Sequence, residues 1–165
     1  MDFATTIDAL RRAGWVYGPP LDDQRPVPRR LLGFPAAFGA WSVSFSRLSN
    51  ADDDVWFLSV EDYLGTSESA FAWNEFERLS LEAAAGPEQA AAVTAFWAGH
   101  LPFLHSVRDD YEYLAIASDG RVVHGREPEF EETTTVADDL PALLAELAGV
   151  DGPRHPLAAA LFAAR

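Results

Sequence analysis

The stretch RDDYEYLAIASDGRVVHG, residues 108–125, decides the fold class of this chain. Along residues 111–117, apolar side chains alternate onto both faces of an extended segment, which is typical of a central strand in a sheet. Asp119-Gly120 follows and predicts a two-residue hairpin turn, which needs positive φ at both central positions. RVVHG, residues 121–125, is then the return strand. The stretch therefore predicts an antiparallel hairpin at the middle of a sheet.

Further strands are predicted on both sides of this hairpin. Extended patterns occur in WSVSFS (41–46), VWFLS (55–59), LPFLHSV (101–107) and EETTTVA (131–137). In the first of these, Trp, Val and Phe alternate with Ser, which indicates a half-buried strand. The turn-rich segment RLSNADDD joins the first two strands and favours a second hairpin.

Helical periodicity marks five other segments. The first is residues 2–13 with Asp2 as a cap, followed by 71–85 and by 87–98, which begins at Pro87 and ends at Gly99. The fourth helix is capped by Asp138 or Asp139 and has an apolar face of Leu140, Leu143, Leu144 and Leu147. The fifth is a last short helix in HPLAAALFAAR. Residues 18–30 are proline-rich and are predicted to form a loop, whereas the apolar residues 31–40 fit either class of element. Helices and consecutive hairpins together predict an α+β fold, a mainly antiparallel sheet with helices packed against it, in one domain over residues 1–165.

Charge is the strongest global property of the chain. Twelve basic and 26 acidic residues give a formal net charge of −14. A field of that sign repels nucleic acid and anionic membranes and accelerates encounter with basic proteins, although acidity also serves solubility alone. The chain has no cysteine, which excludes disulfides and thiolate metal sites, and it shows neither a signal peptide nor an uninterrupted apolar span of membrane length. We therefore expect a cytoplasmic protein that binds neither nucleic acid nor membrane.

The acidic side chains concentrate in three short segments, which are the predicted partner-binding residues. They are Asp52, Asp53 and Asp54; Asp109, Asp110 and Glu112; and Glu127, Glu129, Glu131 and Glu132 around the aromatic Phe130. In the last segment the carboxylates would steer a partner and Phe130 would anchor it. The alternatives are solvated hairpin loops and charges that protect a sheet edge against wrong pairing.

Motifs for catalysis or metal binding are absent from the sequence. The aspartates at 52–54 lack the spacing of a calcium loop, and neither a nucleophile elbow nor a glycine-rich phosphate loop occurs. The four histidines, His100, His105, His124 and His155, fit no helical zinc motif. His100 and His105 are five residues apart at a predicted strand and His124 is on the neighbouring hairpin arm, so only a meeting of two strand histidines leaves a metal site open. The aromatic residues Trp56, Trp73, Phe76, Phe96 and Trp97 are predicted to be core. We expect no catalytic residue, no metal and no cofactor, and hence a protein that is not an enzyme.

An ordered set of segments resembles the SMI1/KNR4 superfamily, also called SUKH. VWFLSVEDYLG is similar to the family's strand and short helical turn, HLPFLHSVRDDYEYLAIASDGRVV to its Leu-Pro strand, central strand and Asp-Gly hairpin, and FEETTTVADDLPALLAEL to its closing strand and final helix. The resemblance covers residues 55–147. In residues 1–50 the pattern departs from the family, because RRLLGFPAAFGAW stands in the N-terminal part where members often show an aspartate-tyrosine segment followed by Asn-Gly.

The resemblance implies a SUKH-like α+β fold and a binding role without shared catalytic residues. Many bacterial members resemble immunity proteins that neutralise secreted toxins, frequently nucleases, and fungal members resemble regulators of cell-wall synthesis. The prediction is therefore a bacterial immunity protein whose acidic surface binds a basic toxin. A regulatory or scaffold adaptor that binds several proteins is the alternative, and a metal-dependent hydrolase, which would carry a bound divalent ion, is the third hypothesis.

Overall fold

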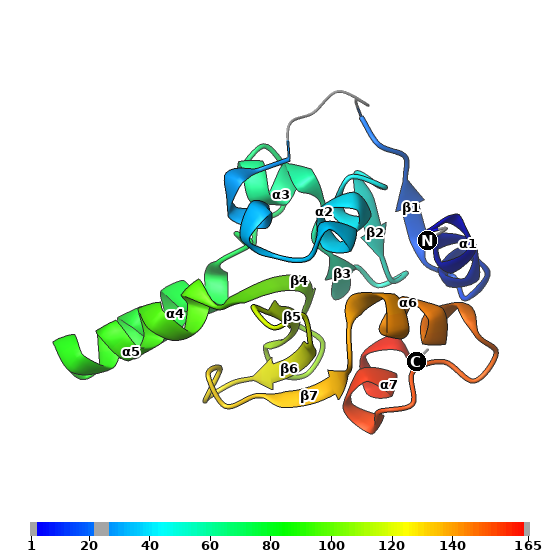
Figure 1. Ribbon diagram of the computed structural model, residues 1–165. Helices are drawn as coiled ribbons and strands as arrows, with labels where there is room; N and C mark the ends of the chain where they lie inside the picture. Colours follow the sequence, from blue (N-terminus) through cyan, green and yellow to red (C-terminus); the bar gives the residue numbers. More distant parts are fainter. Residues whose placement is uncertain (1–2, 22–26, 164–165) are drawn as a thin grey trace.

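The computed structural model describes residues 3–21 and 27–163, in which seven strands form one antiparallel sheet (Figure 1). The strands lie side by side in the order of the sequence, so each pairs with the strands before and after it. They are β1 (Val16–Gly18), β2 (Arg47–Ser49), β3 (Val55–Phe57), β4 (His100–Ser106), β5 (Glu112–Ala117), β6 (Val122–Arg126) and β7 (Thr134–Ala137). The predicted α+β class, with a mainly antiparallel sheet and packed helices, is confirmed.

Seven α-helices and one 3₁₀ helix accompany the strands in the described residues. They are α1 (Phe3–Arg12), η1 (Arg29–Gly33), α2 (Ala36–Ser42), α3 (Val60–Leu64), α4 (Glu75–Ala83), α5 (Pro87–Ala98), α6 (Leu140–Ala148) and α7 (Pro156–Phe162). None of these helices is long and apolar enough to cross a membrane. Asp2, the expected cap of the first helix, lies outside the described residues.

β5 is a central strand, as the apolar character of both its faces predicts. It pairs with β4 over its whole length and with β6 over most of it, and Leu114 faces Leu104 on one side and His124 on the other. Residues 113–117 are buried. This three-strand centre fixes the register of the neighbouring strands, because a slip of one residue would exchange the side chains on the two faces.

The hairpin between β5 and β6 differs from the predicted two-residue turn. Gly120 has a φ of 92°, but Asp119 is not among the residues with positive φ. The N–H of Ala117 donates to the carbonyl of Arg121 at 2.9 Å, and the N–H of Gly120 donates to the carbonyl of Ala117 at 2.8 Å. These bonds enclose a three-residue loop with glycine in its left-handed position, a common alternative to the two-residue turn.

The predicted strand at 41–46 is wrong, because this segment is the end of α2 and the turn after it. Trp41 in the last turn of α2 and Phe45 in the turn after it are fully buried, with ring centroids at 5.2 Å. The hydroxyl of Ser42 donates to the carbonyl of Gly39 at 2.9 Å, and that of Ser44 donates to Ala40 at 2.8 Å. Serine side chains that bond back to the preceding turn satisfy its carbonyls and favour a helix end over a strand. The strand begins later, at β2.

The sheet buries an apolar layer on each face. The larger layer packs α1, α2, α6 and α7 against the sheet and includes Phe57, Phe103 and Leu114. The smaller layer packs α4 and α5 against the other face and includes Phe76 and Tyr113. All five residues are at most 2 % exposed. The aromatic residues predicted to be core lie in or against these two layers.

A helical arm, formed by α4 and α5, extends away from the sheet (Figure 1). α5 has the predicted bounds, with Pro87 in its first turn and Gly99 at its end. α4 is shorter than the predicted 71–85 and begins after Asn74. Only the base of the arm is buried, where Phe76 and Trp97 contact the sheet layer.

α6 carries its predicted cap and apolar stripe, and α7 has a cap that was not predicted. Asp139 is the cap of α6, and its Oδ1 accepts from the N–H of Ala142 at 2.7 Å. The four stripe leucines of α6, Leu140, Leu143, Leu144 and Leu147, are all buried. His155 caps α7 through its Nδ1, which accepts from the N–H of Leu157 at 3.3 Å.

Candidate functional site

The sheet topology brings the three acidic segments to one end of the molecule. In an antiparallel meander the turns β2–β3, β4–β5 and β6–β7 emerge at the same end of the sheet. Two backbone hydrogen bonds join these turns in sequence, from Val107 to the carbonyl of Asp54 at 2.8 Å and from Glu127 to the carbonyl of Tyr111 at 2.9 Å. We name this surface the acidic end. Its members are Asp52, Asp53, Asp54, Asp109, Asp110, Glu112, Glu127, Glu129, Glu131 and Glu132.

Four carboxylates of the acidic end are half-buried and bond within the protein. Glu112 lies 2.8 Å from Nε2 of His124, and Oε1 of Glu127 accepts from the N–H of Tyr111 at 3.0 Å. Glu131 accepts from the indole N–H of Trp97 at 2.7 Å. Asp54, the fourth, is bound by Asn50 and Arg108. These four carboxylates hold the turns in place. Fewer carboxylates of the acidic end therefore face solvent.

The six remaining carboxylates are exposed. They are Asp52, Asp53, Asp109, Asp110, Glu129 and Glu132. Asp53 forms a surface ion pair with Arg47 at 3.0 Å, in which both side chains are more than half exposed. Such pairs are weakly bound and exchange readily with a competing charge. The acidic end thus presents carboxylates from three separate turns to solvent.

Phe130 is not the exposed anchor that the sequence predicts. Its side chain is only 5 % exposed and stacks on Phe76, with ring centroids at 4.8 Å. The carbonyl of Phe130 accepts from the hydroxyl of Tyr113 at 2.5 Å. Burial, with a smaller contribution from Glu131, raises the pKa of Tyr113 well above its usual range, so this hydroxyl remains a donor. The turn folds back over the smaller apolar layer and removes Phe130 from the surface.

Tyr111 takes the place of the exposed aromatic residue at the acidic end. It lies between Asp110 and Glu112, and 36 % of its surface is exposed. The ring of Phe71 meets it edge-on at 5.5 Å, and Phe76 lies at 6.2 Å, so the Tyr111 ring is supported from below. The sequence pattern placed Tyr111 on a strand face and gave no signal of its exposure. In the structure β5 begins one residue later, at Glu112, so Tyr111 lies in the turn before the strand.

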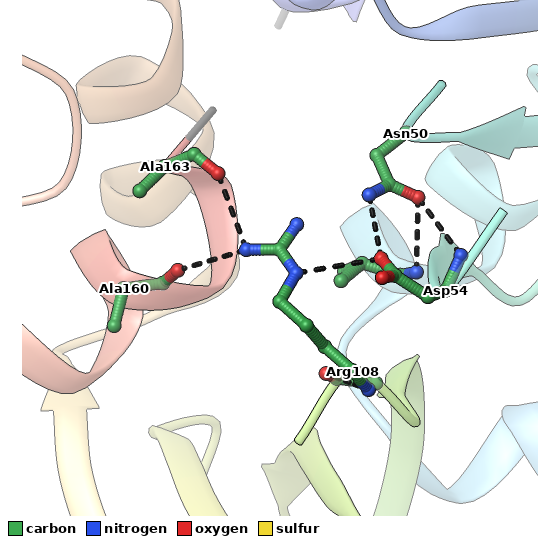
Figure 2. Close-up of polar contacts among 7 residues, drawn as sticks. Asn50, Asp54, Arg108, Ala160 and Ala163 are labelled. Atoms are coloured by element: carbon green, nitrogen blue, oxygen red, sulfur yellow. Dashed lines mark hydrogen bonds and ion pairs between the residues drawn. The ribbon is translucent and has the colours of Figure 1, made fainter. Parts of the chain in front are cut away.

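Arg108 connects the acidic end to the C-terminal helix (Figure 2). Its side chain is only 12 % exposed; Nε donates to Oδ1 of Asp54 at 3.4 Å, and Nη1 donates to the carbonyls of Ala160 at 3.4 Å and Ala163 at 3.2 Å. Asn50 bonds the same carboxylate, since its Nδ2 donates to Oδ1 of Asp54 at 2.6 Å. This network fixes the β2–β3 turn against α7. This network could not be predicted from the sequence, since Asp54, Arg108 and Ala163 lie far apart in the chain.

Substitution of Arg108 tests this network. The variant Arg108→Met is expected to lower the free energy of unfolding by about 1–3 kcal/mol, because Asp54 and the last carbonyls of α7 lose their donor. Urea unfolding at neutral pH measures the change. Arg121→Met is the matched control, since Arg121 pairs with Asp119 where both side chains are more than half exposed, and no measurable loss is expected there. Equal losses in the two variants would contradict the structural role of Arg108.

The histidines of neighbouring hairpin arms do not meet. His100 and His105 lie on β4 and His124 lies on β6, and β5 separates the two strands. Among the described residues, no group of three or more His, Asp or Glu side chains converges in a way that would hold a metal ion. His105 is fully buried against Trp56 and Phe76, with neither ring nitrogen bonded.

Comparisons of the chain with protein-family models, with curated proteins and with solved structures find no match. The acidic end is therefore interpreted from its own geometry and charge, and the SMI1/KNR4 resemblance and all that it implies stay predictions.

Proposed function

We propose that this protein is a SUKH-like immunity protein, a stoichiometric inhibitor that binds a basic toxin through its acidic end. The observation that carries the proposal is the set of six exposed carboxylates on three turns at the same end of the sheet, together with the exposed ring of Tyr111 on the middle turn. The formal net charge of −14 extends the attraction beyond the contact surface. The ordered resemblance over residues 55–147 adds the expectation of a binding role.

A nuclease is the toxin class that such a surface fits. An enzyme that binds a phosphate backbone displays Arg and Lys at its active site. Carboxylates that imitate the phosphates would be steered to this site and would cover it, while Tyr111 offers a face on which a guanidinium stacks. The four half-buried carboxylates and Arg108 hold the turns in position, so little conformational entropy is lost on binding.

Affinity capture from the source cells separates this function from an adaptor role. Tagged protein is incubated with lysate and washed at low and then at high salt, and retained proteins are identified by mass spectrometry. One basic protein retained near one-to-one through the high-salt wash supports the toxin inhibitor. Several partners lost together support a regulatory or scaffold adaptor, and retention of acidic proteins alone would overturn the proposed use of the acidic end.

Zero-length cross-linking maps the contact directly. The chain has no lysine, so a carbodiimide cannot couple its carboxylates to its own side chains and forms amide bonds with lysines of the partner. We expect cross-links at exposed members of the acidic end such as Asp110 and Glu132. Cross-links confined to the acidic residues of the helical arm would place the contact elsewhere.

Neutralisation of exposed carboxylates is expected to slow association with the captured partner. The variant D52N/D110N/E129Q/E132Q should lower the association rate constant at least about tenfold at low ionic strength and should flatten its salt dependence. The control E68Q/E77Q/E82Q/E88Q removes the same charge from α4, α5 and the segment before them. Stopped-flow or surface-binding kinetics measure both. If the two variants behave alike, net charge alone is responsible and the acidic end is not the contact surface.

A further inference from the structure

A groove of about 560 Å³ lies between α1, α7 and the connection from α6 to α7. Its apolar lining includes Leu10, Trp15 and Leu147, which are all buried. Small side chains form much of its walls, including those of Ala9 on α1 and Ala159 on α7, so the groove stays open for a side chain from outside. Neither the acidic end nor the proposed inhibitor function uses this groove.

The walls of the groove are held in fixed positions. The hydroxyl of Thr6 on α1 donates to the carbonyl of Leu144 on α6 at 3.0 Å, in the buried interface of the two helices. The ring of Trp15 stacks on Phe162 of α7, with centroids at 5.5 Å. Arg108 holds the C-terminal end of α7. The groove is therefore preformed, and an occupant would bind without reorganising it.

An apolar side chain stands at the rim of the same groove. Val150 belongs to the lining and is fully exposed, on the α6–α7 connection that projects from the molecule (Figure 1). Among the exposed large apolar residues of the described chain it is the most exposed. A protruding apolar group beside an apolar groove is the arrangement that a two-fold contact needs, because each copy then offers both the insert and its receptor.

The charges around the groove are balanced, unlike those of the chain as a whole. Asp8 pairs with Arg11 at 3.4 Å, and Glu146 pairs with Arg154 at 3.5 Å. Arg12 at the end of α1 and Asp151 on the α6–α7 connection remain among the lining residues, and neither forms an ion pair within the described residues. Residues 3–15 and 140–163 thus hold three carboxylates and three arginines, and the formal charge of −14 belongs to the rest of the chain. A second, equally acidic copy is repelled least at this face.

We propose that two copies of this protein associate around a two-fold axis at this groove. Val150 of each copy enters the groove of the other and covers Trp15 and Leu147. Arg12 of each copy pairs with Asp151 of the other, so one dimer contains two such ion pairs. Val150, Arg12 and Asp151 are exposed in the single chain, so substitutions of these three residues are expected to leave the folded chain intact.

Sedimentation velocity over a concentration series from about 5 μM to about 500 μM tests the dimer. The unaltered protein is expected to shift from one copy to two copies across this range. Val150→Asp should raise the dimer dissociation constant roughly a hundredfold, because two buried valines are lost per dimer at about tenfold or more each. Leu32→Asp is the control, since Leu32 is exposed on η1 and its substitution should leave the dissociation constant unchanged.

Charge reversal distinguishes the two-fold contact from any other association. Arg12→Asp and Asp151→Arg are each expected to abolish the dimer, because like charges then face each other twice. An equimolar mixture of the two variants should restore a mixed dimer, and so should the double variant R12D/D151R. A single sedimenting copy at every concentration of the unaltered protein would overturn the proposal. A dimer that survives Val150→Asp and both reversals would overturn it equally.

Discussion

Acidification from pH 6.5 to pH 3 is expected to remove about 5 kcal/mol of folding stability through His105 alone, since burial lowers the pKa of this side chain from 6.5 to about 3. His105 has no surface in contact with solvent, and neither ring nitrogen has a hydrogen-bond partner. Its neighbours on β3 and α4 are the rings of Trp56 and Phe76, at 5.6 and 4.7 Å. An imidazolium has no favourable place among these rings.

The sign of the effect follows from proton binding. Between the two pKa values the unfolded chain binds a proton at His105 and the folded chain does not. Stability therefore rises with pH in this window, at about 1.4 kcal/mol per pH unit, and is lost as the pH falls. Above pH 6.5 the imidazole is neutral in both states, and its titration no longer contributes.

His105→Phe is expected to remove this pH dependence. Urea unfolding should show a slope smaller by about 1.4 kcal/mol per pH unit than that of the unaltered protein between about pH 5.5 and about pH 4.5, and a smaller difference between about pH 7 and about pH 5.5. His105→Leu serves as a second variant should the larger ring strain the layer. His100→Gln is the control, because His100 is half-buried and hydrogen-bonded to the carbonyl of Phe96. If His105→Phe keeps the original slope, other groups govern acid unfolding.

Phe76→Ala is expected to lower the free energy of unfolding by about 3–5 kcal/mol. The side chain is fully buried at the base of the helical arm, and its ring stacks on Phe130 at 4.8 Å and on Tyr113 at 5.6 Å. Truncation leaves a cavity between the rings of His105 and Tyr113 on two strands and that of Phe130 on a turn. These rings cannot close it together, so the loss should lie at the upper end of the range for aromatic residues.

Urea unfolding measures the loss, and hydrogen exchange of residues 75–98 locates it. The control is Leu81→Ala in the same helix, where 37 % of the side chain is exposed, and its cost should be below about 1 kcal/mol. Exchange should quicken in the whole arm in Phe76→Ala and stay unchanged in Leu81→Ala. A loss below about 1 kcal/mol for Phe76→Ala would show that the arm and the sheet fold as independent units.

Segments with local signals could be predicted well from the sequence. α5 begins at Pro87 and ends before Gly99, because a proline in the first turn and a glycine after the last act within a few residues. The cap Asp139 and the four buried leucines of α6 could be predicted for the same reason, because both signals lie within the helix and its first turn. The central hairpin is also local, although its turn takes three residues instead of two.

Features that depend on contacts across the chain could not be predicted. The alternation in 41–46 has the period of a strand, but backbone bonds of Ser42 and Ser44 and burial of Trp41 with Phe45 make it a helix end. Part of the candidate site could likewise be predicted from the sequence and part could not. Its carboxylates could be identified by charge, whereas the pairing of strands in sequence order, which brings them to one end of the sheet, is a property of the whole fold. The exchange of Phe130 for Tyr111 as the exposed ring depends on how the β6–β7 turn folds over Phe76.

The strictly sequential order of the strands also has a consequence for how the chain folds during synthesis. β4, β5 and β6 are joined by short turns, so little loop entropy opposes their pairing. β3 meets β4 only after residues 58–99 have been made, and β1 and β2 are three-residue strands that extend the sheet from β3. The first third of the chain therefore leaves the ribosome before its sheet partner exists. We expect it to stay unfolded until the β4–β6 hairpins have formed, so that the end synthesised first is the end that folds last.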